Sequence, residues 1–121
     1  MSTPQIVITQ TGSAPAIVSL SGEHDRATSH QLDATLSRAI DAGDGVVVDL
    51  TEASFIDSAI LCVLIRAHDA ADALGKEGLA VVAPPSSAAA RLFDLVAADK
   101  ALAIFPSREG ALATYAAIPG V

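Results

Sequence analysis

Residues 49–61 read Asp-Leu-Thr-Glu-Ala-Ser-Phe-Ile-Asp-Ser-Ala-Ile-Leu, and they hold the polar side chains whose types and spacing best suit chemistry. An apolar strand ends at Asp49, a short polar loop follows, and a helix is predicted to begin around Asp57 and Ser58. The first N–H groups of a helix lack partners and carry partial positive charge. A hydroxyl placed there could accept a phosphoryl group, whose negative charge the helix terminus would tolerate. The simpler alternative is that Asp57 or Ser58 only caps the helix.

The chain contains none of the common catalytic or cofactor signatures, such as G-x-x-x-x-G-K-[ST], G-x-G-x-x-G, H-E-x-x-H or G-x-S-x-G. The histidines at 24, 30 and 68 lack the spacing that places two rings on one helix face, so we expect ordinary surface or loop residues. Cys62, inside an apolar helical pattern, is expected to be a small core residue. An enzyme or nucleotide-binding site would have few polar residues to use, namely Asp25, Thr28, Asp57 and Ser58. We therefore expect no catalysis, no cofactor and no metal.

The composition fits one small domain, residues 1–121, with an aliphatic core, since 51% of its residues are hydrophobic and only 3% are aromatic. A net charge of −7 is unsuited to nucleic acid and to anionic lipid. The longest apolar run, residues 59–65, is far shorter than the roughly 20 residues of a membrane span. The first five residues lack the pattern of a signal peptide. A cytoplasmic domain without direct membrane insertion is the expectation.

The elements that must position Asp57 and Ser58 follow from hydrophobic spacing. Runs of apolar and β-branched residues predict strands at residues 5–9, 16–20, 45–50, 79–83 and 102–105. The first two strands, separated by residues 11–15, are predicted to pair as an antiparallel hairpin. Residues 51–57 are predicted to be a loop.

Four helices are predicted between and after these strands. The first starts with a capping box of Thr28 and Gln31 and stops at Gly43, and the second runs from Ser58 to Leu74 with Gly75 as its end. The third is capped by Ser86 or Ser87 and carries Leu92, Leu95 and Val96, and the fourth is capped by Ser107 and carries Leu112 and Tyr115. The order β-β-α-β-α-β-α-β-α predicts an α/β domain with a mixed, four- to five-stranded sheet, one face of which carries most of the helices.

Three segments, in order and spanning nearly the whole chain, resemble the STAS domain family, which is named for sulfate transporters and anti-sigma-factor antagonists. Residues 20–28, Leu-Ser-Gly-Glu-His-Asp-Arg-Ala-Thr, are similar to the family's L-x-G-E-x-D-x-x-T segment before its first helix. Residues 47–58 are similar to its D-L-x-x-x-x-F-[IM]-D-S loop. Residues 80–93 and 104–112 are similar to its C-terminal third.

The resemblance implies a regulatory binding module that works by partner switching. In stand-alone members, the unphosphorylated domain binds an anti-sigma factor, usually with a serine-kinase-like fold, and thereby frees a sigma factor. Phosphorylation at the helix start breaks that complex, because a phosphate on the contact surface is desolvated and repelled by like charge. The residues that the resemblance assigns to partner binding and regulation here are Asp25, Thr28, Asp57, Ser58, Ala59 and Ile60.

The sequence departs from the family at the phosphorylation site. Where the family reads D-S-[ST]-G-L, this chain reads Asp-Ser-Ala-Ile-Leu from Asp57, so Ala59 occupies the acceptor position and Ile60 replaces a glycine. Three interpretations stay open: a constitutive antagonist, a STAS partner subunit of a membrane-transport assembly, or phosphorylation of Ser58 instead. Ile60 either adds apolar contact surface or belongs to the core. We expect a monomer or a weak homodimer.

Overall fold

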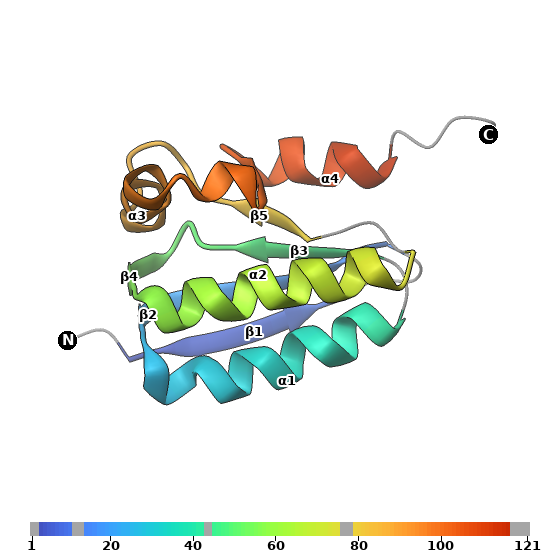
Figure 1. The fold of residues 1–121 in the computed structure, drawn as a ribbon, viewed down its shortest axis with the longest axis horizontal. Helices are drawn as coiled ribbons and strands as arrows, with labels where there is room; N and C mark the ends of the chain where they lie inside the picture. The colour runs from blue at the N-terminus through green and yellow to red at the C-terminus, as the bar shows by residue number, and fades with distance from the viewer. Residues whose placement is uncertain (1–2, 11–13, 43–44, 76–78, 117–121) are drawn as a thin grey trace.

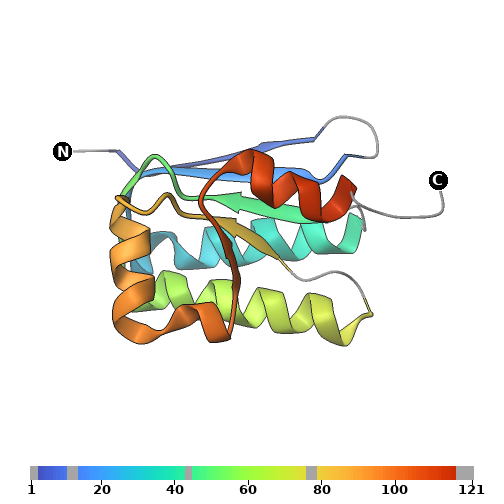
Figure 2. The ribbon, with the colours of Figure 1, turned by 90° about the horizontal axis from the view of Figure 1, so that it is seen from above.

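The apolar runs that predict strands lie in one mixed sheet with helices on both of its faces (Figures 1 and 2). The computed structural model describes residues 3–10, 14–42, 45–75 and 79–116. In chain order the elements are β1 (Gln5–Thr9), β2 (Ala16–His24), α1 (Arg26–Ala42), β3 (Val46–Asp49), β4 (Ala53–Ile56), α2 (Ser58–Ala73), β5 (Ala80–Val82), α3 (Ala88–Val96), the 3₁₀ turn η1 (Ala98–Lys100), β6 (Ala103–Phe105) and α4 (Arg108–Ala116). The predicted α/β class is confirmed.

The strand order places the carboxyl ends of the parallel strands at one end of the sheet. β1 and β2 form the predicted antiparallel hairpin, with Gln5 opposite Ser21 and Thr9 opposite Ile17. Residues 11–13 of the predicted connection lie outside the described residues. β3, β5 and β6 then follow β2 in parallel, so the main sheet reads β1-β2-β3-β5-β6.

The segment predicted as the loop 51–57 contains a strand, and the prediction was wrong there. β4 pairs in parallel with the end of β2, so that Ala53 lies opposite Gly22 and Ile56 lies opposite His24. The register shifts between Gly22 and Glu23, where Gly22 has a φ of +82°. A Cβ on Gly22 would lie 2.5 Å from the carbonyl oxygen of Thr3, so this glycine allows the N-terminal segment to cross closely. A four-residue strand depends on the neighbouring backbone of β2, which local sequence does not reveal.

The alternating residues of the strands divide the core between the two faces of the sheet. The larger cluster joins β2 and β3, through residues such as Leu20 and Val48, to the apolar stripes of α1 and α2. The smaller cluster holds Val47, Ala80 and Val82 against Ala111 of α4. Figure 2 shows α1 and α2 together on one side of the sheet, which agrees with the expectation that one face carries most of the helices. In the part of the chain that the structure describes, no helix is both long enough and apolar enough to cross a bilayer.

The helix boundaries test the predicted caps. α1 begins at Arg26, two residues before the predicted capping box, so that prediction was wrong. The carboxylate of Asp25 accepts a hydrogen bond of 2.8 Å from the N–H of Ala27, while Thr28 already lies within the first turn. α2 ends as predicted, with Leu74 as its C-cap and Gly75 at a φ of +74°. The predicted stop of α1 at Gly43 lies outside the described residues.

Hydroxyl caps at α3 and α4 are confirmed. The Oγ atom of Ser87 accepts from the N–H of Ala90 at 3.1 Å, and that of Ser107 accepts from the N–H of Gly110 at 3.1 Å. The apolar face predicted for α3 was partly wrong, because Leu95 is 83% exposed and Val96 is 50% exposed. Leu92 packs against the core as predicted, and the buried residues of α3 are Ala89, Ala90 and Phe93.

Candidate partner-binding site

The start of α2 is built by Asp57, which follows β4 directly. Its backbone is extended, with φ −113° and ψ −174°, and its Oδ1 atom accepts hydrogen bonds from Ala59 N–H at 3.0 Å and from Ile60 N–H at 3.1 Å. These two bonds satisfy two of the donors that a helix start leaves unpaired. Asp57 is therefore the cap of α2. Ser58 is the first helical residue and is exposed to solvent.

The pairing of β2 with β4 brings the predicted site residues to one end of the sheet. Ile56 lies opposite His24, so the residues that follow, Asp57 and Asp25, come from adjacent strand ends. Asp25 is exposed, and Thr28 is half-buried in the first turn of α1. The starts of α1 and α2 are thus neighbours, although the residues that form them are about thirty positions apart in the chain.

His24 contacts the first turn of α1 from the interior of the domain, whereas the sequence predicted an ordinary surface or loop residue. It is fully buried. Its Nε2 atom lies 2.9 Å from the carbonyl oxygen of Ser21, and its Nδ1 atom lies 3.0 Å from the Oγ1 atom of Thr28. A carbonyl oxygen accepts only, so Nε2 carries the proton, and in the neutral ring the Thr28 hydroxyl has two acceptors within reach, Nδ1 of His24 at 3.0 Å and the carbonyl oxygen of Asp25 at 3.3 Å. Extending the buried alternation of β2 from Leu20 through Gly22 predicts this burial.

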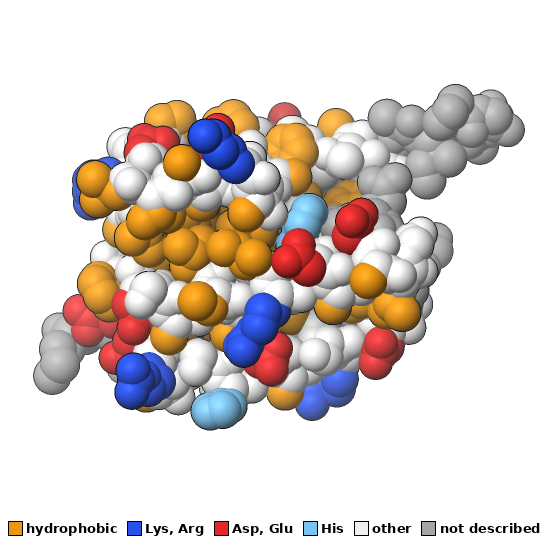
Figure 3. Space-filling model, viewed as in Figure 1, with side chains coloured by type: hydrophobic (Ala, Val, Ile, Leu, Met, Phe, Trp, Pro, Cys, Tyr) orange, Lys and Arg blue, Asp and Glu red, His pale blue; other side chains and the backbone are white. Residues whose placement is uncertain are grey.

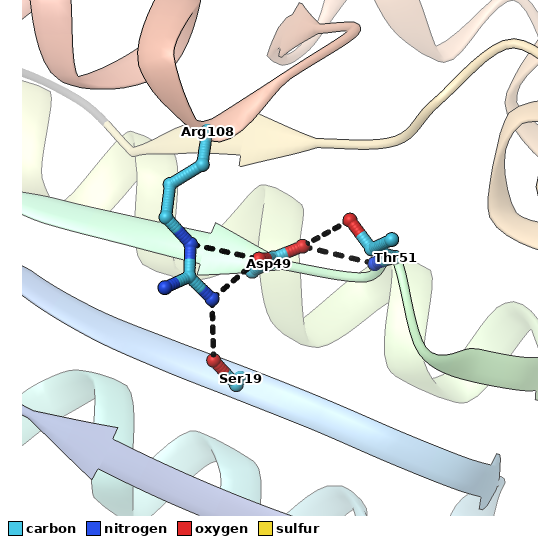
Figure 4. Close-up of polar contacts among 4 residues, drawn as sticks. All are labelled: Ser19, Asp49, Thr51 and Arg108. Atoms are coloured by element: carbon cyan, nitrogen blue, oxygen red, sulfur yellow. Dashed lines mark hydrogen bonds and ion pairs between the residues drawn. The ribbon is translucent and has the colours of Figure 1, made fainter.

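A polar cluster that the sequence predictions did not include lies at the end of β3 (Figure 4). Arg108 donates from Nε and from Nη2 to the Oδ2 atom of Asp49, at 3.0 and 2.7 Å, and its Nη2 also donates to the Oγ atom of Ser19 at 3.3 Å. The hydroxyl and the N–H of Thr51 donate to the other oxygen, Oδ1. Burial by itself raises the pKa of Asp49, but the hydrogen bonds from Thr51 and Arg108 outweigh it and hold that pKa below its ordinary value of 3.8. Through Arg108, the cluster links the start of α4 to β2 and β3.

Exposed apolar side chains lie on α3, which crosses the end of the sheet where α2 begins. Leu95 and Val96 belong to α3, which packs against β4. Figures 1 and 2 show α3 across the end of the sheet where α2 begins, and Figure 3 shows hydrophobic side chains gathered between these two helices. Cys62, one turn after Ser58, is exposed, so its prediction as a core residue was wrong. We use the term α2–α3 surface for the exposed residues Ser58, Cys62, Leu95 and Val96.

Comparison with known proteins assigns the fold to a family. Residues 7–105 match the family model described as Mlab, STAS domain. The chain belongs to the STAS domain family. The expected family is thereby confirmed, and the match covers the sheet, the start of α2 and α3. No curated protein sequence matches the chain significantly.

Solved structures similar to this STAS domain include regulatory proteins. An anti-sigma factor antagonist from Mycobacterium paratuberculosis is 24% identical with a TM-score of 0.77, over 94% of this chain and 95% of that one. The antagonist SpoIIAA in its unphosphorylated form is 18% identical with a TM-score of 0.71, over 94% of this chain and 100% of that one. SpoIIAA from Bacillus in its phosphorylated form is also 18% identical, with a TM-score of 0.67, over 91% of this chain and 98% of that one. The STAS fold is thus one that regulatory binding modules use.

In this STAS domain the three residues after Asp57 have different environments. Ser58 is exposed, Ala59 is half-buried, and Ile60 is fully buried in the larger core. Of the two alternatives predicted for Ile60, the structure supports the core position, so Ile60 adds no apolar area to the surface. Because successive helical residues point about 100° apart, Ser58 and Ala59 face different directions.

A groove on the STAS domain lies away from these residues. It has a volume of about 340 Å³ and runs between α1 and α2, where Arg66, Ala67, Ala70 and Leu74 line the α2 side. Of the polar residues that sequence could offer an enzyme, namely Asp25, Thr28, Asp57 and Ser58, none lines this groove. Among the described residues, no group of three or more His, Cys, Asp or Glu side chains is arranged to hold a metal ion.

Proposed function

We propose that this STAS domain is a regulatory module that binds an anti-sigma factor with a serine-kinase-like fold and thereby releases a sigma factor. The observation that carries the proposal is the exposed start of α2 with Ser58, at the end of the sheet that α3 crosses. On α3, Leu95 is a large apolar side chain left 83% exposed. Exposed apolar area of this kind marks a surface that a protein partner can cover.

Ala59 defines the proposed mode of regulation. The side chain of alanine has no oxygen, so this position cannot take a phosphoryl group. A domain of this kind stays competent to bind its partner when a kinase is active, and we propose that it acts as a constitutive antagonist. Phosphorylation at Ser58 is the contrasting possibility, because that hydroxyl is exposed at the positive end of α2.

The net negative charge of the chain favours a partner with a basic docking face. The chain carries 14 acidic and 7 basic residues, so a basic docking face would be attracted to it and would associate faster at low ionic strength. The alternative partner is a membrane-transport assembly to which the domain would contribute as a subunit. Both partners would use an apolar contact, and the identity of the captured protein distinguishes them.

The test is affinity purification of the tagged chain from its own host, with partners and phosphorylated residues identified by mass spectrometry. Ser58→Arg and Leu95→Glu change the α2–α3 surface without touching the core. Their matched controls are Thr114→Arg, an exposed residue of α4, and Leu74→Glu, which is 61% exposed at the far end of α2. Asp57 and Ile60 are left intact, since replacing the cap or a core residue would weaken the fold itself.

The expected result is an anti-sigma factor that binds the wild type and both controls but neither surface variant, with Ser58 unmodified. Capture of transport subunits instead would overturn the antagonist proposal. Equal loss of binding in surface variants and controls would overturn the proposed site. A phosphate on Ser58 that releases the partner would overturn constitutive action.

A further inference from the structure

We propose that two copies of this chain pair through the free edge of β1, antiparallel and about a two-fold axis at Val7, to form one continuous sheet. Among the described strands, β1 pairs with β2 alone and so ends the sheet on that side. Its other side presents backbone N–H and C=O groups that a second strand can use. All of its residues except Ile6 are exposed, including Val7 at 52% and Ile8 at 50%.

The edge of β1 lacks the usual protection against pairing. Sheet edges are commonly shielded by charged side chains, by proline, by a bulge or by short length. Residues 5–9 contain no charge and no proline, and their register with β2 runs without a shift from Gln5 to Thr9. The opposite edge is different, since β6 has only three residues, Ala103–Phe105. The free side of β4 is also shorter, with four residues, so among the described strands β1 offers the longest unprotected edge.

The distribution of charge favours a second copy as the occupant. The chain has a net charge of −7, so two copies repel each other over most of their surfaces. Residues 1–22, however, contain no Asp, Glu, Lys or Arg, and Glu23 is the first charged residue. Both strands of the hairpin are thus uncharged from Gln5 to Gly22. Two copies can approach along this side of the sheet without placing like charges opposite one another.

The sequence of β1 also fits itself. With the two-fold axis at Val7, Val7 lies opposite its own symmetry mate, Ile6 lies opposite Ile8, and Gln5 lies opposite Thr9. Polar residues then pair with polar ones, and β-branched residues pair with β-branched ones, which is the favourable arrangement across antiparallel strands. Ile6 and Ile8 stand on the face of their partners Leu20 and Val18, so the second copy extends the apolar layer of the larger core. A two-fold interface uses one patch twice, as this strand allows.

The first experiment measures association of the full chain by sedimentation equilibrium over a range of concentrations. Val7→Lys places two ammonium groups together at the axis and should weaken the dimer at least tenfold. Leu74→Lys is the matched control, because Leu74 is similarly exposed, at 61%, but is the C-cap of α2. Circular dichroism checks that both variants stay folded. A wild type that is monomeric throughout, or equal weakening by the two substitutions, would overturn the proposal.

Cross-linking tests the register. In a Cys62→Ser background, Val7→Cys brings two thiols directly opposite each other and should give a covalent dimer with oxidised glutathione. Thr9→Cys is the control, because its symmetry mate lies four residues along the strand, roughly 13 Å away, beyond the reach of a disulfide. Cross-linking of Thr9→Cys in place of Val7→Cys would show a different interface. Because β1 does not belong to the α2–α3 surface, either outcome leaves the proposed partner binding to be judged separately.

Discussion

Arg108, the first residue of α4, donates two hydrogen bonds to a single carboxylate oxygen of Asp49, the last residue of β3. The pair joins positions 59 residues apart and is the point at which α4 is fastened to the C-terminal end of the sheet. Asp49 is only 7% exposed, so its charge depends on the partners that the fold supplies. Thr51 donates to the Oδ1 atom of Asp49, and Arg108 donates to its Oδ2 atom.

Replacing Arg108 by Met should lower the free energy of unfolding by about 1–2 kcal/mol, because Asp49 would stay charged with only Thr51 to bind it. The side chain of Arg108 is 49% exposed, and screening by water keeps the loss below that of a fully buried pair. Urea denaturation near neutral pH measures the change. Arg91→Met, at an exposed position of α3, is the control and should stay within about 0.5 kcal/mol of the wild type.

The stability that Asp49 contributes should depend on pH. A carboxyl group whose pKa is lower in the folded chain than in the unfolded chain stabilises the fold above the unfolded pKa. That contribution is lost as the pH falls through the folded value. The difference in unfolding free energy between the wild type and Asp49→Asn should therefore be full near neutrality and should shrink below the ordinary pKa of 3.8. Urea titrations at several pH values test this, and a difference that stays constant into strong acid would contradict it.

Ile60→Ala should reduce stability by about 2–5 kcal/mol, since it opens a cavity at a fully buried position. Ser58→Ala, two residues earlier, should change stability by less than about 0.5 kcal/mol, because that side chain is exposed. Thermal and urea unfolding of the two variants provide the comparison. Similar losses in both would mean that Ile60 is not the core residue of this pair.

When its ring is neutral, His24 should be the Nε2–H tautomer, as its bond to the Ser21 carbonyl requires. Nitrogen chemical shifts of the imidazole ring identify the tautomer, and the Nε2 proton should exchange slowly with solvent because the ring is fully buried. His30, which is exposed, is the internal reference. An Nδ1–H tautomer at His24 would contradict the assigned hydrogen bonds.

Local signals predicted the starts of α3 and α4 and the end of α2, because such ends depend on a few adjacent residues, although the start of α1 was misplaced. Ser87 and Ser107 cap their helices by bonds to N–H groups three residues on, and Gly75 supplies the positive φ that ends α2. β4 was missed for the opposite reason. Its four residues form a strand because β2 continues to His24 and offers them its free backbone. The pairing of β4 with the end of β2 is a tertiary contact, so no local sequence pattern predicts it.

In the candidate site, too, the features set by adjacent residues were predicted and those set by tertiary packing were not. The capping pattern left Asp57 and Ser58 as alternatives at the start of α2, and the structure selects Asp57. The environment of Ile60 and the exposure of Leu95 depend on how α2 and α3 pack, and helical spacing alone left the first undecided and misjudged the second. The Asp49–Arg108 pair could have been suspected from one signal, an acidic residue ending a continuous apolar strand, because a carboxylate there requires a cation.

The pairing of β4 with β2 has a consequence for the thermodynamics of association. Residues 53–56 carry α2 on a fixed strand, so the chain before Ser58 is already ordered when the domain is free. A partner that docks there would not have to immobilise a loop, and the conformational entropy lost on binding would be small. The free and bound backbones of this end of the domain should then superpose closely, with recognition decided by side chains on a rigid support.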